Sequence, residues 1–492
     1  MDASNAHNSL NRSESLLQIQ HICPEFSIYL INTYRIPCKL FISNADGEFI
    51  LSREGTTQGD NAASGFYALG ITPLINILAT IDCDQIWYAD DAGATGTFEK
   101  LKEWWDTLNE NGPKLGYFPE PSKTWLVVKP NLEQKAKEIF AGTGVKITSE
   151  GRKYLGSPIG TREFVKSFVT EMISDWEKEL HDLTQIAKQA PQVCYAAYVF
   201  GLSKRWLYIM RTTPDIAELF EPLESCITEQ FLPTLFKKFN AVTLRKVIAL
   251  PAKLGGLSIF NPTEIAADEY KYSTSATEPL VRLIIEQNLT FVSVNIRQEA
   301  QAEKTSIATA KLAKSKKQQE ALANDTILCK VIKHQSQKGA SLWLTTLPGE
   351  NLGFLIHAQE FQYALCLRYN LPISNMPTFC ACGKANSVDH ALCCMKGGYT
   401  VMRHNDVRNT EAALLQEVCK DVTIEPPLIP SKELGDRSSL DVGARGLWSG
   451  LEKTLFDVRI FHPGAPSYQN RSLESIYKAH EKERRTNISI MC

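Results

Sequence analysis

Over its first 160 residues the chain alternates short apolar blocks with polar turns that contain glycine or proline. An apolar run over 81–87 leads to the adjacent acids Asp90 and Asp91, and glycines follow. This order predicts a strand, a tight turn that carries two carboxylates, and a second strand. The uncharged run over 62–81 contains proline and predicts a buried helix. Together these patterns indicate an α+β fold.

The pattern becomes helical beyond about residue 162. Large apolar residues recur there at four-residue steps, which places them on one helix face; they are Phe164, Phe168, Met172 and Trp176. Residues 263–337 are rich in Ala, Lys, Gln and Glu and predict a helical connector. Strand-like pieces return at 422–426, 440–444 and 454–461. In the last piece Asp457 and Arg459 alternate with apolar residues and should share one strand face.

Composition limits the class of protein. The chain has 492 residues, 43% of them apolar, which allows several domains and a substantial core. Thirteen cysteines, an odd number, argue against a complete disulfide framework. No signal peptide and no long charge-free apolar span is visible, so we expect an intracellular protein, nuclear or cytoplasmic, with no membrane partner.

The formal net charge of −2 is unusual for a nucleic-acid binder, so basic residues must be segregated if the chain binds nucleic acid. The alternative for each basic run is a solvated helix face. The candidate phosphate contacts are Lys135, Lys137, Lys237, Lys238, Arg245, Lys246, Lys311, Lys314, Lys316 and Lys317.

The acidic turn has a specific chemistry. Adjacent carboxylates repel one another unless a cation neutralises them, and Mg²⁺ is bound by a few carboxylates together with substrate phosphates. The alternative is a solvated Asp-Asp turn without a ligand. Upstream, the loop over 54–60 contains two glycines, which allow a backbone to approach a nucleotide closely.

A second cluster contains Cys380, Cys382, His390 and the adjacent pair Cys393 and Cys394. Thiolate and imidazole ligands at such short separations in a reducing compartment point to a structural Zn²⁺ site with four ligands. Zinc can order a short segment that has no core of its own. The alternative is a set of free thiols beside a surface histidine.

Five ordered motifs carry a resemblance to a known family. The stretches DASNAHNSLNR, EGTTQGD, YADDAG, GYFPEPSKTWLVV and YLGSPIG resemble successive palm motifs of non-LTR retrotransposon reverse transcriptases. The resemblance implies that Asp2, Asp90 and Asp91 hold two Mg²⁺ ions. It also implies that Lys123 lies near the pyrophosphate, where its alternative is a plain surface lysine.

The same resemblance assigns a nucleotide pocket and a primer contact. His7, Gln58 and Gly59 would line the pocket for the incoming deoxynucleotide, and residues 154–156 would help to hold the primer end. Two positions depart from the family pattern. His7 replaces an aromatic residue that normally blocks a ribose 2′-hydroxyl, and Asn61 replaces a proline.

The third departure concerns the start of the chain. Related polymerases have a fingers region before the first catalytic aspartate, whereas this chain reaches Asp2 immediately after Met1. We therefore expect an N-terminally truncated polymerase with little or no activity alone. We also expect Asp2 to be poorly held, because chain termini fray unless they are tied down.

The C-terminal part resembles the branch of this family that carries a zinc cluster and a restriction-like endonuclease. By that likeness Cys394 is the fourth zinc ligand and Cys393 is the spare thiol. Asp441 and Asp457 would bind Mg²⁺, and Arg459 would orient the substrate, because arginine cannot release a proton. Glu417 is a possible extra ligand. The alternative is an amphipathic αβ unit with a surface Asp-x-Arg pair.

In this likeness three residues at the start of the helix after the zinc cluster would face the DNA backbone, namely Arg403, His404 and Arg408. The expected organisation is a palm at 1–160, a helical thumb at 161–262, a helical connector at 263–375, a zinc cluster at 376–400 and a nuclease domain, possibly incomplete, at 401–492.

The resemblance implies target-primed reverse transcription. A nick in DNA would supply the primer, and a bound RNA would serve as the template for deoxynucleotide addition. Two alternatives remain at this point. One is a decayed fragment that only binds nucleic acid, and the other is a domesticated scaffold protein without enzymatic activity.

Overall fold

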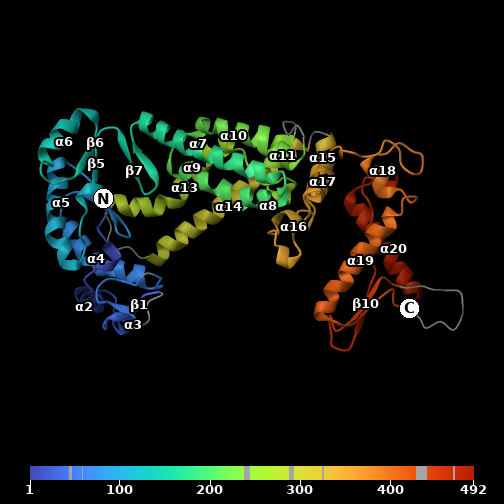
Figure 1. Cartoon of the computed structure of the whole chain (residues 1–492), viewed down its shortest axis with the longest axis horizontal. Coiled ribbons are helices and arrows are strands. Elements are labelled where there is room, and N and C mark those ends of the chain that lie inside the picture. Colours follow the sequence, from blue (N-terminus) through green and yellow to red (C-terminus); the bar gives the residue numbers. More distant parts are fainter. Residues whose placement is uncertain are drawn as a thin grey trace. The chain divides into compact units, whose positions relative to one another are not determined.

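The computed structural model describes the chain except for residues 44–46, 58, 238–243, 288–292, 324–325, 428–439, 469–470 and 492; the side chains of 293–294, 326–327 and 483–491 are also outside the description. It is 60% helix and 11% strand, which confirms the α+β class. The chain divides into two compact units, whose elements are labelled in Figure 1 where there is room. The first contains 1–185, 197–231 and 259–318, and the second contains 186–196, 232–258 and 319–492.

The first unit opens with short helices and a hairpin around one long buried helix. These elements are α1 Ala6–Ser9, α2 Arg12–Ile22, α3 Pro24–Tyr34, the antiparallel strands β1 Cys38–Phe41 and β2 Phe49–Ser52, and α4 Ala63–Leu78. Helix α4 is the predicted buried helix: Phe66, Tyr67 and Leu74 are almost completely buried. Its uncharged sequence is therefore explained by packing against α2 and the rest of the core.

The predicted acidic hairpin is present. Strand β3 Asp84–Tyr88 pairs antiparallel with β4 Asp91–Thr95, and Tyr88 is opposite Asp91. The turn between them uses Ala89 at φ 53°, a conformation that a non-glycine residue rarely adopts. Helix α5 Phe98–Asn111 follows, and the Thr97 side chain caps its first turn.

Two further strand pairs complete this part of the first unit. Strand β5 Trp125–Val127 lies parallel to β6 Lys146–Thr148, and β7 Gly151–Tyr154 pairs antiparallel with β8 Ser157–Gly160. The connecting segments are the 3₁₀ turns η1 Gly112–Leu115, η2 Pro121–Lys123 and η3 Pro130–Leu132, and helix α6 Glu133–Ile139.

The predicted helical region begins at α7 Arg162–Ala187, and its buried face lies close to the predicted one. Trp176 is buried and its ring lies 5.9 Å from that of Trp206, whereas Phe164 and Phe168 are only half-buried. The other helices of this region in the first unit are η4 Ala197–Leu202, α9 Ser203–Thr212, η5 Ala217–Phe220, α10 Glu221–Cys226, η6 Ile227–Phe231, α13 Pro262–Ile285 and α14 Ser293–Leu322.

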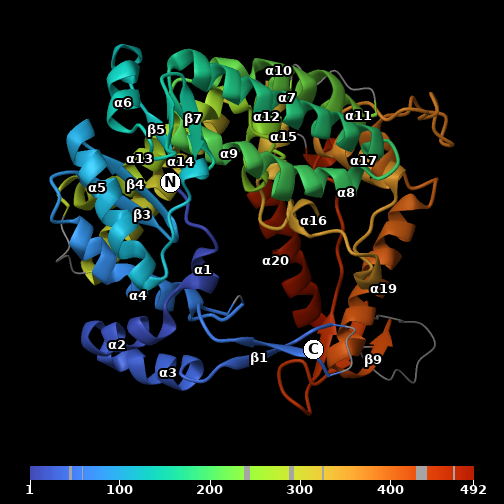
Figure 2. The ribbon, with the colours of Figure 1, turned by 60° about the vertical axis from the view of Figure 1, so that its left-hand side comes forward.

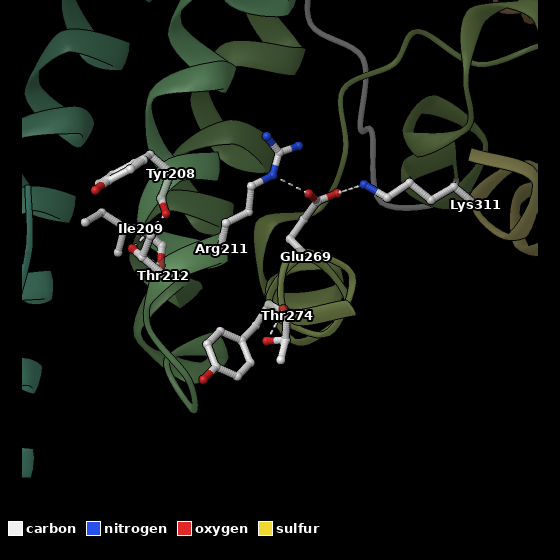
Figure 3. A network of polar contacts seen from close by, with 8 residues as sticks. Tyr208, Ile209, Arg211, Thr212, Glu269, Thr274 and Lys311 are labelled. Atoms are coloured by element: carbon white, nitrogen blue, oxygen red, sulfur yellow. Dashed lines mark hydrogen bonds and ion pairs between the residues drawn. The ribbon is translucent and has the colours of Figure 1, made fainter. Parts of the chain in front are cut away.

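A shared carboxylate joins three of these helices. Glu269 of α13 accepts from Arg211 of α9 at 2.9 Å and from Lys311 of α14 (Figure 3). Lys314 of α14 forms an ion pair with Asp268 of α13 beside it. Two lysines that the sequence offers as phosphate contacts therefore have acidic partners within the protein. The same holds for Lys135 with Glu99 and Lys137 with Glu133, while Lys238 lies outside the described residues.

The second unit is helical up to the cysteine cluster. Its helices before that point are α8 Pro191–Ala196, α11 Leu232–Leu235, α12 Arg245–Ala249, η8 Ala252–Leu254, α15 Thr326–Gln335, α16 Leu342–Thr345, η9 Glu350–Leu352 and α17 Ala358–Arg368. Helix α15 and the helices of 262–322 confirm that this stretch is helical. In α17 Arg368 is buried and donates to the carbonyl oxygens of Ala252 and Gly256, so it organises the backbone of this unit.

The end of the second unit is a small sheet covered by a helix. Strand β10 Val442–Arg445 lies between β9 Lys420–Ile424 and β11 Lys453–Phe456, and both pairings are antiparallel. Helix α19 Tyr399–Val418 packs on β9 and β10. Figure 2 shows α19 beside β9. The remaining elements are α18 Val388–Cys393, η10 Pro466–Tyr468 and α20 Leu473–Met491.

One sequence expectation is wrong here. The third strand ends at Phe456, and Asp457 and Arg459 lie in the irregular segment after it. They therefore do not share a strand face. The alternation of apolar residues over 454–461 continues past the point at which the partner strand β10 ends. Among the described residues, no helix combines the length and apolar character that a bilayer crossing requires.

Candidate active site and metal centre

The first four residues form an extended strip tied to two other segments. The amide of Ala92 in β4 donates to the carbonyl oxygen of Met1, and the amide of Glu120 donates to that of Asp2 at 3.0 Å. The amide of Ser4 donates to the carbonyl oxygen of Phe118 at 2.8 Å. The expectation that Asp2 is poorly held is therefore wrong, because backbone hydrogen bonds on both sides fix its position.

Two glycines allow the continuation of this strip to pack closely. Gly55, at φ 72°, lies so near the backbone of His7 that an added Cβ would be 2.4 Å from its carbonyl oxygen. At Gly116, with φ 82°, an added Cβ would be 2.0 Å from the carbonyl oxygen of Ser9. Both positions need glycine for conformation and for space.

Lys123 forms an ion pair with Asp2, the first of the expected metal ligands. Its ammonium lies 3.1 Å from Asp2 Oδ2, and the hydrogen bond from Lys123 to that carboxylate raises the pKa of Lys123. The 3₁₀ turn over 121–123 presents the lysine, and the amide of Lys123 donates to the Glu120 carbonyl. Lys123 is solvent-exposed, so its charge is available to a ligand beside Asp2.

The carboxylates of the hairpin and of Asp2 interact electrostatically. Burial, the charge of Asp90 and the charge of Asp2 raise the pKa of Asp91, and the Met1 ammonium opposes this shift. The Tyr117 hydroxyl donates to the carbonyl oxygen of Asp90 at 2.9 Å and braces the turn. Asp2 is therefore within electrostatic range of the hairpin acids, but among the described residues Asp2, Asp90 and Asp91 do not form a group whose ligand atoms are gathered closely enough to hold one metal ion.

The expected nucleotide-pocket residues are placed in part. His7 Nδ1 lies 3.2 Å from Thr56 Oγ1, and its ring is 4.5 Å from that of Tyr67 on α4. Gly59 has φ 90° and no atom within 4 Å of the position that a Cβ would take. Gln58 lies outside the described residues.

Sequence reasoning missed the buried Arg12. Its guanidinium donates to the carbonyl oxygens of Ser52, Glu54 and Gly55, and its own amide donates to the Glu54 carboxylate. Arg12 thus shapes the loop that precedes Gly59. Its position in a polar N-terminal segment carries no signal for burial, because its partners are 40–43 residues away along the chain.

The cysteine cluster is gathered in the second unit. Ligand atoms of Cys380, Cys382, His390 and Cys394 all lie within 4.8 Å of one another. In the part of the chain that the structure describes, no other group of three or more such side chains is found this close together. Cys393, the expected spare, is not in the group.

The spacing of these atoms suits a tetrahedral ion. The Sγ atoms of Cys380 and Cys394 are 3.6 Å apart, and Cys382 Sγ is 3.2 Å from His390 Nε2. Zinc–ligand bonds of about 2.0–2.3 Å give edges of roughly 3.5–3.8 Å in a tetrahedron. The first pair already has this spacing, and the second would have to open by a few tenths of an ångström. The cluster can hold a metal such as zinc.

Local structure explains how the ligands meet. In a tight turn the Gly383 amide donates to the Cys380 carbonyl oxygen at 2.8 Å. The Ser387 side chain caps α18 by accepting from the His390 amide. Helix α18 then carries His390 and places Cys394 directly after its last turn. The turn supplies two ligands and the helix end supplies the others.

Of the expected nuclease residues, Asp441 and His404 are in contact. His404 Nε2 of α19 lies 3.3 Å from Asp441 Oδ1 and 3.0 Å from the Val458 carbonyl oxygen. The Val458 amide donates to Asp441 Oδ2 at 2.6 Å. Both carboxylate oxygens of Asp441 are therefore held. His404, expected to face DNA, contacts this carboxylate, and Arg408 forms an ion pair with Glu425.

A second acid of α19, Glu411, interacts electrostatically with Asp441. Burial and the charge of Asp441 raise the pKa of Glu411, whereas Glu417 lies exposed farther along α19. Glu411 precedes Glu417 by six residues, about 1.7 helical turns, so the two acids lie on different faces of α19, and the sequence alone does not show which face meets Asp441. Asp457 is half-buried and Arg459 is exposed after β11.

Comparison with known proteins adds no assignment, since the chain matches no protein-family model and no curated protein sequence. The chemical character of the two sites therefore comes from the residues themselves.

We predict that only one of the two adjacent cysteines, Cys394, is a zinc ligand. Cys394→Ser should lose bound zinc, because a hydroxyl is a poor replacement for a thiolate ligand, while Cys393→Ser should retain it. Metal content of the purified variants, measured by mass spectrometry, checks this. Equal zinc retention in both variants, or equal loss, would contradict the ligand set.

We also predict a pH-dependent gain in stability on neutralising Asp91. A carboxyl with a raised pKa in the folded state lowers the free energy of unfolding as the pH rises above its ordinary value of 3.8. Asp91→Asn should therefore be more stable than the wild type at pH 7, and the difference should shrink toward acid pH. Urea unfolding at several pH values measures it. Asp82→Asn, an exposed change just before the same hairpin, serves as the control.

Proposed function

We propose that this chain is a reverse transcriptase fragment of the non-LTR retrotransposon class, an RNA-directed DNA polymerase that takes part in target-primed reverse transcription. The main support is the convergence of three sequence-distant groups. Asp2 pairs with Lys123, and both Asp2 and Asp90 raise the pKa of Asp91. These are the positions that the motif resemblance assigns to metal binding and to the pyrophosphate.

In this proposal Asp2, Asp90 and Asp91 hold Mg²⁺, which when bound supplies the charge stabilisation that phosphoryl transfer requires. The protein's own groups have separate tasks. Lys123 neutralises charge on the pyrophosphate and can donate a proton to it. His7, packed on Tyr67 and hydrogen-bonded to Thr56, contacts the sugar of the incoming nucleotide. The proposed partners are an RNA template, a DNA primer and deoxynucleoside triphosphates.

The second part of the proposal is a DNA-nicking activity in the last 90 or so residues. Its support is the pair of acids Asp441 and Glu411, together with His404, which holds one oxygen of Asp441. In the proposal Asp441 and Asp457 hold Mg²⁺ with Glu411 as a further ligand, and Arg459 orients the substrate. The zinc cluster orders the segment that precedes this region.

The polymerase proposal predicts Mg²⁺-dependent primer extension on an RNA template. We expect it most clearly when an upstream fingers segment of a non-LTR reverse transcriptase is fused to this chain. Asp90→Asn should reduce extension by at least about 100-fold, because a metal-holding carboxylate is lost. Asp82→Asn is the matched control and should leave extension nearly unchanged.

One result would contradict the polymerase proposal: salt-sensitive template binding without primer extension, both in the chain alone and in the chain fused to the fingers segment. It would favour a decayed fragment that only binds nucleic acid. Binding of a protein partner without any nucleic-acid binding would favour a domesticated scaffold.

The nuclease proposal predicts Mg²⁺-dependent nicking of supercoiled plasmid DNA. Glu411→Gln should lower the nicking rate by at least about 100-fold, as expected for a lost metal ligand. Glu417→Gln, an exposed change on the same helix, should leave the rate unchanged. Equal effects of the two substitutions would show that Glu411 has no special role.

A further inference from the structure

The small sheet of the second unit has one face covered by a helix and one open face. Val442 and Ala444 of β10 are buried in one cluster with residues of α19. Gly443 lies between them and therefore belongs to the opposite face, because side chains alternate along a strand. Its two partners in the neighbouring strands, Thr423 of β9 and Leu455 of β11, are exposed. This open face is not used by the proposed chemistry.

Three cations lie side by side across the open face. Arg445 of β10 is in register with Lys420 of β9 and with Lys453 of β11, so each strand contributes one cation. A register shift in the β9 pairing keeps Lys420 opposite Arg445. The Lys453 side chain lies across Gly443, where an added Cβ would be 2.8 Å from its Cε. Since strands are about 4.8 Å apart, the row spans about 10 Å.

The row has little internal counter-charge. Arg445 Nε lies 3.1 Å from Asp421 Oδ2, whereas no carboxylate of the described residues is within ion-pair distance of Lys420 or Lys453. Glu452 directly precedes Lys453, so strand alternation turns its side chain toward the other face. The open face therefore has a net positive charge, which favours an anionic partner.

The loop that joins β10 to β11 presents two large apolar side chains to solvent. Leu451 is 85% exposed and Trp448 is 80% exposed, the highest values for large apolar side chains among the described residues. The loop is held at its base, because the Gly446 amide donates to the Glu452 carbonyl oxygen at 3.2 Å. Arg445 Nη1 also donates to the Leu451 carbonyl oxygen at 2.7 Å. An exposed indole on a fixed loop can stack on the face of a nucleic-acid base.

We propose that this face binds single-stranded nucleic acid. Phosphates would contact Lys420, Arg445 and Lys453, and one base would stack on Trp448. Cations beside an exposed aromatic ring bind such strands through backbone charge and stacking. A lipid surface is disfavoured, because an interfacial anchor needs a broad apolar face and this loop exposes two apolar side chains. The loop lies at the opposite end of β10 from Asp441, and the inference requires neither the polymerase nor the nuclease proposal.

The test measures binding of a short fluorescein-labelled oligothymidylate to the full chain by anisotropy, without Mg²⁺ and at several salt concentrations. Lys420→Gln combined with Lys453→Gln should make the dependence of log affinity on log salt less steep by about 1.4, because each phosphate contact with a single strand contributes about 0.7. Trp448→Ala should weaken binding at least about fivefold and leave that slope unchanged. Trp448→Phe keeps an aromatic face and should bind within about threefold of the wild type.

Two controls use exposed positions of the same unit. Lys333→Gln with Lys338→Gln removes the same charge, and Leu352→Ala removes an exposed apolar side chain of η9; neither should change the affinity or the slope.

The proposal is overturned if the wild-type chain does not bind the oligonucleotide, or if the Lys420/Lys453 variant keeps the wild-type slope. It is also overturned if the control lysine variant changes the slope equally, because binding would then depend only on overall charge. Unchanged oligonucleotide binding by Trp448→Ala overturns it as well. If that variant also loses binding to phosphatidylserine vesicles, the partner is a membrane.

Discussion

The candidate active site depends on backbone hydrogen bonds of the first four residues. Met1 and Asp2 accept from Ala92 and Glu120, and Ser4 donates to Phe118. These bonds join the acidic hairpin to the segment that carries Lys123, and no side chain is needed to make them. Without the strip, Asp2 would have no defined distance to either group. A hydrogen bond of this kind contributes only about 1 kcal/mol, so the arrangement relies on several acting together.

The strip also has an electrostatic cost. It brings the Asp2 carboxylate toward Asp90 and Asp91, and burial, then the charge of Asp90 and to a smaller extent that of Asp2 raise the pKa of Asp91. The Met1 ammonium and the Lys123 ammonium reduce this repulsion from two sides. Sites that concentrate like charges in this way are typical of functional regions, where stability is given up for ligand binding. The cysteine cluster has the same character, since four ligands gather without a hydrophobic core around them.

Local patterns in the sequence predicted the parts of the fold whose signals are local. The strand–turn–strand around Asp90, the buried helix after Asp60 and the helical region after Arg162 all follow from residue periodicity. The cysteine cluster was predictable because its ligands lie within fifteen residues. Contacts across long separations were not predictable. Arg12 and its loop are an example, as is Glu411, which differs from Glu417 only in the face of α19 that it occupies.

The last strand shows why periodicity can mislead. Alternation over 454–461 suggested a continuous strand, but a strand needs a partner, and β10 offers none beyond Val442 opposite Phe456. Asp457 and Arg459 therefore lie in irregular backbone, while the amide of Val458 turns to the Asp441 carboxylate. Pairing partners set the ends of strands, and a single strand's sequence does not contain that information.

Gly55 and Gly116 hold the strip's continuation from two sides at backbone distance. A methyl group at either position would overlap a carbonyl oxygen of residues 7–9 and push that segment away. The displacement would reach Asp2 a few residues earlier, although neither glycine has a side chain that could bind a ligand. In a saturation mutagenesis screen these two glycines should therefore behave like catalytic residues, and an interpretation based on chemistry alone would misassign them.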